Sequence, residues 1–176
     1  LGNENLADAT RFLVNELFGE YGLVVIDGDD SRLKKEFAAI IFDDIFNQTN
    51  FKIVTETISE LKKSGYEAQV NPREINIFYL GENSRTRIEK AEPQYGTEIE
   101  AAPERFSPNV VLRSLYQQMI LPNIAYVGGP SELSYWLEYK KMFEHHKIAF
   151  PALIQRNSVL WIGEKLNQQI EKMNFD

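Results

Sequence analysis

Hydrophobic positions along the chain follow two different spacings. Apolar residues recur every three or four positions in five segments, which predicts amphipathic helices over residues 6–18, 33–45, 51–61, 111–119 and 133–143. Short apolar runs predict strands at 22–27, 124–127 and 150–154. From residue 66 the period changes to two, which predicts strands at 67–70 and 75–80 and a hairpin partner at 84–90.

Two remaining segments complete the pattern. Residues 91–105 are polar and contain two prolines, so they are predicted to form an exposed loop. Residues 159–174 are predicted to return to helix. Helices and strands alternate along most of the chain, which predicts one α/β domain over residues 1–176, with a parallel crossover sheet layered with helices. Residues 66–105 are expected to form a β-rich or loop-rich excursion within it.

The composition of the chain limits the kinds of molecule that it is expected to bind. The 176 residues carry a net charge of -7 and no cysteine, so disulfides and thiolate metal sites are excluded. Basic residues are dispersed, as in Lys34-Lys35 and Lys62-Lys63, which argues against nucleic acid and leaves a local site for a small anion open. No apolar run approaches the roughly 20 residues that cross a bilayer, and the first ten residues lack signal-peptide features. We therefore expect a cytoplasmic protein without a membrane partner.

The turn Gly128-Gly129-Pro130 is the first candidate for ligand binding. Glycines after a strand let backbone N–H groups approach a ligand, and the following helix presents its positive end to an anion. The alternative is an ordinary connector, because the motif is neither a dinucleotide fingerprint nor a P-loop. Glu132 follows in the first helical turn, where it either stabilises the helix dipole or serves a substrate, by holding an amine or acting as a base.

Two further pairs carry candidate chemistry. Asn109 and Arg113 are four residues apart and share a helical face, where Arg113 could bind a carboxylate or phosphate bidentately. Arg156 and Ser158 follow the last predicted strand and could bind an anionic group. The alternatives are a solvated helix surface for the first pair and a plain polar turn for the second.

The sequence does not predict a metal site. His145 and His146 are the only histidines, and adjacent helical positions point about 100° apart, which does not suit one metal ion. Asp27-Gly28-Asp29-Asp30 lacks the spacing and closing glutamate of a calcium loop. We interpret it as a strand end followed by a helix cap.

Three segments resemble a known family. The stretches LADATRFLVNELFGEYGLVVIDGDD, REINIFYL and RFSPNVVLRSLYQQMILPNIAYVGGPSELSYWLEYKKMFEHHKIAFPALIQRNS are similar to the bacillithiol biosynthesis cysteine-adding enzyme (BshC) family, with the central and C-terminal part of its core as the expected match. The resemblance implies a Rossmann-like core similar to class I aminoacyl-tRNA synthetases. It also implies a carbon–nitrogen ligase that joins L-cysteine to glucosaminyl malate, with ATP as a cofactor by analogy only.

The resemblance also implies a set of site residues. Glu132 and Arg113 are expected to act in catalysis. The residues expected to bind substrates are Asn109, Gly128, Gly129, Pro130, Tyr135, Trp136, Arg156 and Ser158.

The chain departs from the family pattern in four ways. It lacks the Gly-His-Gln motif and the C-terminal coiled coil, it has Arg113-Ser114 where the family has Arg-Pro, and its stretch between Arg87 and Arg105 is shorter. We therefore expect a fragment that does not turn over alone. An exposed apolar sheet face would favour aggregation or a homodimer.

Two other functions stay open. One is a non-catalytic α/β module that binds a nucleotide or sugar, and the other is a scaffold that binds a partner through aromatics such as Tyr135 and Trp161. Convergence of Asn109, Arg113, Glu132 and Arg156 on one pocket would favour the enzyme or the small-molecule module. A flat apolar face would favour the scaffold.

Overall fold

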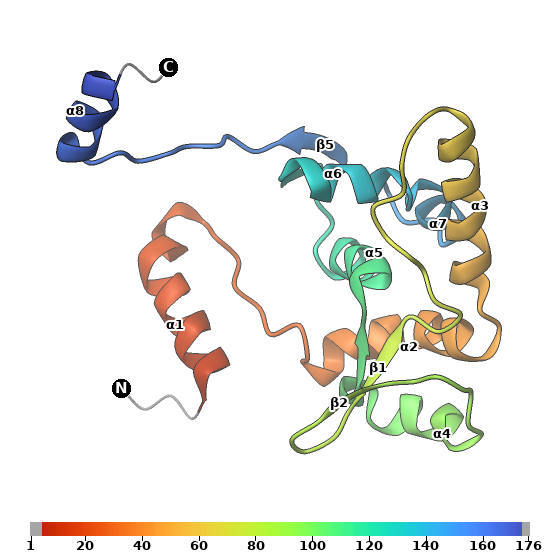
Figure 1. Cartoon of the computed structure of the whole chain (residues 1–176). Helices are drawn as coiled ribbons and strands as arrows, with labels where there is room; N and C mark the ends of the chain where they lie inside the picture. Colours follow the sequence, from red (N-terminus) through yellow and green to blue (C-terminus); the bar gives the residue numbers. More distant parts are fainter. Residues whose placement is uncertain (1–4, 174–176) are drawn as a thin grey trace.

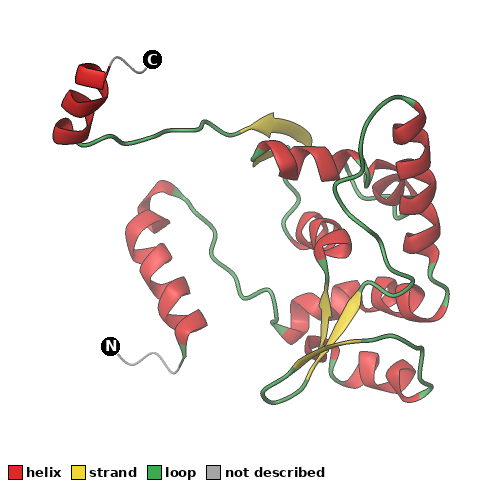
Figure 2. Ribbon diagram, in the orientation of Figure 1, coloured by secondary structure: helices red, strands yellow, loops and turns green. Residues whose placement is uncertain are grey.

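The computed structural model describes residues 5–173 and has the fold shown in Figures 1 and 2. Its α-helices are α1 (Leu6–Phe18), α2 (Ser31–Phe46), α3 (Thr49–Lys63), α4 (Gln94–Ala101), α5 (Val110–Ile120), α6 (Pro130–Leu137), α7 (Lys140–His145) and α8 (Glu164–Met173). Its strands are β1 (Ile77–Leu80), β2 (Arg85–Arg87), β3 (Phe106–Pro108), β4 (Ala125–Gly128) and β5 (Ala152–Gln155). Short 3₁₀ turns, η1 (Gly19–Tyr21) and η2 (Pro103–Arg105), follow α1 and α4.

The helices begin and end where local chemistry satisfies their backbone groups. Asn5, Asp30 and Asn109 each accept a backbone N–H at the start of α1, α2 and α5. Gly65 follows α3 with φ of +85°, a left-handed conformation that glycine adopts without strain. The helices predicted over 6–18, 33–45 and 51–61 are confirmed, whereas the one predicted over 133–143 is divided into α6 and α7.

The strands form two small sheets. The antiparallel sheet has the order β2-β1-β3, and Phe78 of β1 is opposite both Arg87 and Ser107. The second sheet is the parallel pair β4–β5, joined through α6 and α7. The predicted parallel crossover sheet is therefore present, but it has two strands in the described part of the chain. The excursion at 66–105 contains β1, β2 and α4.

The core lies between α2, α3, α5 and the α6–α7 pair (Figure 1). Phe37, Ile41, Leu112 and Leu115 are fully buried in it, and Trp136 is 1% exposed. By contrast, α1 has no buried residue, and Figure 1 shows α1 and α8 standing away from the other helices.

Three predicted elements were wrong. Residues 22–27 are not a buried strand: they form no strand, and Leu23 and Val24 are 46% and 64% exposed. Residues 67–70 also form no strand. An extended run becomes a strand only where a neighbouring strand accepts its backbone hydrogen bonds, and neither run has such a neighbour in the described chain.

The third correction concerns residues 91–105, which are largely helical rather than a loop. Helix α4 buries Ile99 and packs on α2, so a single apolar anchor sufficed in a polar stretch. A smaller difference affects α5: Ser107 and Pro108 belong to β3, and Asn109 caps the helix in place of Ser107.

Candidate functional site

The carboxyl ends of β4 and β5 bring the glycine turn and Arg156 together. Gly128 is opposite Gln155 in the parallel register, and the Arg156 backbone N–H donates to the Gly128 carbonyl at 2.9 Å. A Cβ atom placed on Gly129 would lie 3.2 Å from Arg156 Nε. The Arg156 side chain therefore lies against the bare backbone of Gly129, at the edge where open α/β sheets bind ligands.

Glu132 is held in this turn by two hydrogen bonds. The Gly129 N–H donates to Glu132 Oε2 at 2.8 Å, and the Tyr126 hydroxyl donates to Oε1 at 3.1 Å. The Gly129 N–H, then Tyr126, then the charges of Arg156 and Arg113 hold the pKa of Glu132 below its usual value. Burial and the neighbouring Glu132 raise the pKa of Tyr126, so the phenol stays protonated and donates. Glu132 is thus a fixed carboxylate, suited to hold an ammonium group and poorly suited to act as a base.

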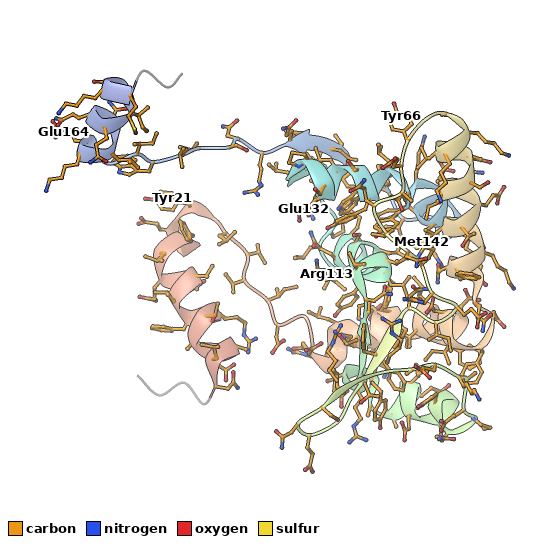
Figure 3. All side chains as sticks on the ribbon, viewed as in Figure 1. Tyr21, Tyr66, Arg113, Glu132, Met142 and Glu164 are labelled. Atoms are coloured by element: carbon orange, nitrogen blue, oxygen red, sulfur yellow. The ribbon has the colours of Figure 1, made fainter. Side chains whose placement is uncertain are left out.

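Arg113 projects from α5 toward the same region. Figure 3 labels Arg113 on α5 and Glu132 on α6. Among residues 5–173 the exposed Arg113 guanidinium forms no ion pair or hydrogen bond, although its charge contributes to the lowered pKa of Glu132. Arg156 lies beside Glu132 at the strand edge, and the charge of Arg113 acts on Glu132 from α5; we call these three residues the β4–β5 edge cluster. They do not share one pocket, because the hollow lined by Asn109 and Arg113 is not lined by Glu132 or Arg156. The cluster offers two cationic forks and one carboxylate.

The other sequence-predicted residues have different positions. Asn109 accepts from Val111 N at 2.8 Å and donates to Asn76 Oδ1 at 2.9 Å, so its side chain caps α5 and is not free for a ligand. Pro130 begins α6 and is exposed. Ser158 is exposed and forms no hydrogen bond within the part of the chain that the structure describes.

The two aromatic candidates pack inward. Trp136 lies in the core with its ring centroid 4.3 Å from Tyr126 and 5.5 Å from Phe143. Tyr135 is half-buried beside Tyr139, at 5.7 Å between ring centroids. Trp136 therefore supports the edge cluster through Tyr126, the phenol that donates to Glu132, and does not reach a ligand itself.

Sequence reasoning missed a pocket of about 320 Å³ on the other side of Arg113. Lys34 lines this pocket and is 1% exposed, with Nζ donating to the Phe106 carbonyl at 2.8 Å and lying 3.0 Å from the Asp29 carboxylate. Burial lowers the pKa of Lys34, and Asp29 opposes that shift. The sequence did contain a signal, because Lys34 shares the inward face of α2 with Phe37 and Ile41.

The described residues contain no cluster of side chains suited to bind a metal ion. Within residues 5–173, no group of three His, Cys, Asp or Glu side chains could hold one. The His146 ring is bonded through Nε2 to Asn50 Oδ1 at 2.8 Å. Burial, followed by the charge of His145, lowers the pKa of His146. No helix in this part of the chain is long and apolar enough to cross a membrane.

The fold and the edge cluster define a Rossmann-like α/β protein with a polar site at the carboxyl ends of its parallel strands. Residues 1–157 match the family model described as "Bacillithiol biosynthesis BshC, N-terminal Rossmann-like domain". The chain belongs to this family, so the predicted family and fold class are confirmed. The match is to the N-terminal domain, not to the central and C-terminal part of the core that we expected.

Curated relatives agree with the family model. The chain is similar to proteins named "Putative cysteine ligase BshC" from Flavobacterium psychrophilum, at 50% identity, and Flavobacterium johnsoniae, at 47%, each over 99% of this chain and 35% of the relative. A protein of the same name from Chlorobaculum tepidum is 31% identical over 91% of this chain and 31% of the relative. The chain thus spans about a third of the length of these relatives.

Proposed function

We propose that this chain supplies one wall of the active site of a ligase that adds L-cysteine to glucosaminyl malate. The observation that carries the proposal is the β4–β5 edge cluster, in which Arg156 lies against Gly129 and the charges of Arg156 and Arg113 help to keep Glu132 ionised. The names of the relatives support a cysteine ligase, and the family description supports bacillithiol biosynthesis.

The cluster matches the charges of both substrates. Glucosaminyl malate carries two carboxylates on its malyl group, which suit the planar forks of Arg113 and Arg156. Cysteine carries an ammonium group, which suits the Glu132 carboxylate. Holding both substrates at one strand edge would convert a bimolecular encounter into a reaction between positioned groups.

The chemical step also needs an activated carboxyl group. The new amide bond joins the cysteine carboxyl carbon to the glucosamine nitrogen, and one carboxyl oxygen leaves. A nucleoside triphosphate would take up that oxygen if the analogy with class I synthetases holds. This chain's own contribution is to bind and orient the substrates, and we propose that it does not turn over without the rest of the enzyme.

Kinetics of the complete enzyme test this proposal. We expect Glu132→Gln to raise KM for cysteine and Arg113→Ala to raise KM for glucosaminyl malate, each by about 10- to 100-fold, since a charged hydrogen bond contributes roughly 1.5–3 kcal/mol. Glu100→Gln and Lys63→Gln are matched controls, because both side chains are exposed and lie outside the cluster. Unchanged kinetics in both test variants would remove these residues from the site.

A further inference from the structure

A second pocket, of about 520 Å³, is lined by four arginines and no acidic residue. Arg85 and Arg87 come from β2, Arg73 from the segment before β1, and Arg113 from the first turn of α5. Such a concentration is unexpected in a chain with 26 acidic and 19 basic residues. We call this hollow the arginine pocket.

The four guanidinium groups have no hydrogen-bonding or charged protein partner within the described residues. Within residues 5–173, none of them forms an ion pair or a hydrogen bond. Some other basic side chains do form ion pairs: Arg11 with Asp27, Arg32 with Asp30 and Lys141 with Glu60. The donors of the arginine pocket are therefore available to a ligand, and their mutual repulsion favours an anion between them.

The antiparallel sheet sets the geometry of the pocket. Arg87, Phe78 and Ser107 are opposite one another across β2, β1 and β3, so they share one face of the sheet. Arg85 is two residues from Arg87 and lies on the same face. Its guanidinium carbon is 3.7 Å from the Phe78 ring centroid, and that of Arg87 is 5.6 Å away. Both guanidinium groups thus lie near the ring of Phe78.

The positive potential extends beyond the pocket. The charge of Arg85 contributes to lowering the pKa of the buried Lys34, on the other side of the Ser107-Pro108 segment. The two carboxylates of a malyl group would balance only part of the charge of four arginines. A chain of two or three phosphates carries more negative charge, and the fork of arginine matches phosphate oxygens bidentately.

We propose that the arginine pocket binds the phosphate chain of a small molecule that carries two or more linked phosphates. The volume is within the range of ordinary ligand pockets. The pocket shares Arg113 with the edge cluster but depends mainly on Arg73, Arg85 and Arg87. The test measures binding without turnover, so the proposal can fail or succeed independently of the proposed ligase activity.

Titration calorimetry of the 176-residue chain tests the proposal without turnover. We expect inorganic pyrophosphate to bind at one saturable site, with an affinity that falls as salt rises. Arg85→Gln and Arg87→Gln should each raise Kd by about 10- to 100-fold. Arg85→Lys keeps the charge but loses the fork, and should fall between wild type and Arg85→Gln. Lys63→Gln removes the same charge outside the pocket and should leave Kd within about twofold of wild type.

Further measurements identify the kind of molecule that supplies the phosphates and check that each variant folds. Tighter binding of ATP than of pyrophosphate would assign a nucleotide, and equal binding would assign the phosphate chain alone. Circular dichroism checks that each variant folds, and Arg73→Gln replaces any β2 variant that does not. The proposal is overturned if neither pyrophosphate nor ATP binds saturably. It is also overturned if Lys63→Gln weakens binding as much as Arg85→Gln, or if malate binds more tightly and is weakened by the same variants.

Discussion

Two carboxylates of this chain have opposite environments. Glu132 is half-buried and accepts hydrogen bonds from Gly129 and Tyr126, which hold its pKa down. Asp44 is fully buried, and burial raises its pKa to about 6 although Asn76 and Asn50 donate to it. Desolvation therefore outweighs hydrogen bonding at Asp44 but not at Glu132.

Asp44 belongs to a polar network that reaches the candidate site. The Asn76 N–H donates to Asp44 Oδ2 at 2.5 Å, and Asn76 Oδ1 accepts from the Asn109 side chain at 2.9 Å. Asn109 caps α5, the helix that carries Arg113. The network thus fixes the start of that helix. The side chain of Asn109, which was predicted to bind substrate, is instead used in this network.

The raised pKa of Asp44 predicts an unusual dependence of stability on pH. The folded state binds the proton more tightly than the unfolded state, whose aspartates titrate near 3.8. The Asp44 contribution to the free energy of unfolding is thus present below about pH 4 and is lost as pH rises to about 6, a change of about 3 kcal/mol.

Urea unfolding of wild type and Asp44→Asn between pH 4 and 7 measures this contribution. We expect the difference between the two proteins to shift in favour of the variant as pH rises, by an amount of this order. The lowered pKa of His146 contributes the opposite slope in both proteins, because the unfolded state binds its proton more tightly. A difference that does not change with pH would show that Asp44 titrates normally.

Among the elements, the β4–α6 turn contains two glycines with different surroundings: Gly128 lies against the packed Tyr126 ring, and Gly129 lies against Arg156. A Cβ on Gly128 would lie 2.6 Å from Tyr126 Cε1, a ring packed on Trp136, whereas a Cβ on Gly129 would meet the flexible Arg156 side chain at 3.2 Å. We expect Gly128→Ala to reduce the free energy of unfolding by roughly 1–3 kcal/mol, because the added methyl group would force the packed Tyr126 ring to move. Gly129→Ala should change it by less than about 1 kcal/mol while displacing Arg156.

Thermal unfolding and substrate binding, measured together, distinguish the two glycines. Gly129→Ala should keep the melting temperature near that of wild type and weaken the binding of glucosaminyl malate. Equal destabilisation by both variants would mean that the turn is an ordinary connector and that the position of Arg156 is incidental.

The elements also show how far the sequence predicts this fold. Helical spacing located α1, α2 and α3 because each presents an apolar stripe or a clear cap, independently of partners. The β4–turn–α6 unit and the placement of Arg156 near it followed from glycines and strand order. The apolar run at 22–27 does not form the predicted strand. An apolar run becomes a strand only when another strand lies beside it, and that depends on the tertiary structure.

The candidate site was only partly visible in the sequence. Glu132, Arg113 and Arg156 could be selected by residue type and spacing. The arginine pocket could not, because it depends on the register that places Arg87 and Ser107 opposite Phe78, and β3 lies far from β1 along the chain. The family resemblance implies Trp136 as a substrate-binding residue, but its helical position faces the core.

At the scale of the whole molecule, apolar surface is exposed at both ends of the described chain. In α1, Leu6, Leu13 and Leu17 are 83%, 56% and 54% exposed, and Trp161 before α8 is 91% exposed. Exposed apolar groups of this kind mark surfaces that contact other protein. The homodimer stays a prediction.

We propose that Arg113, Glu132 and Arg156 form one substrate-binding edge. Titration calorimetry of the complete enzyme with glucosaminyl malate tests this arrangement, using wild type, Arg113→Ala, Arg156→Ala and the double variant. We expect each single variant to weaken binding about 10-fold or more, and the double variant to depart from additivity because the two forks share one ligand. Wild-type affinity in the double variant, in folded protein, would contradict it.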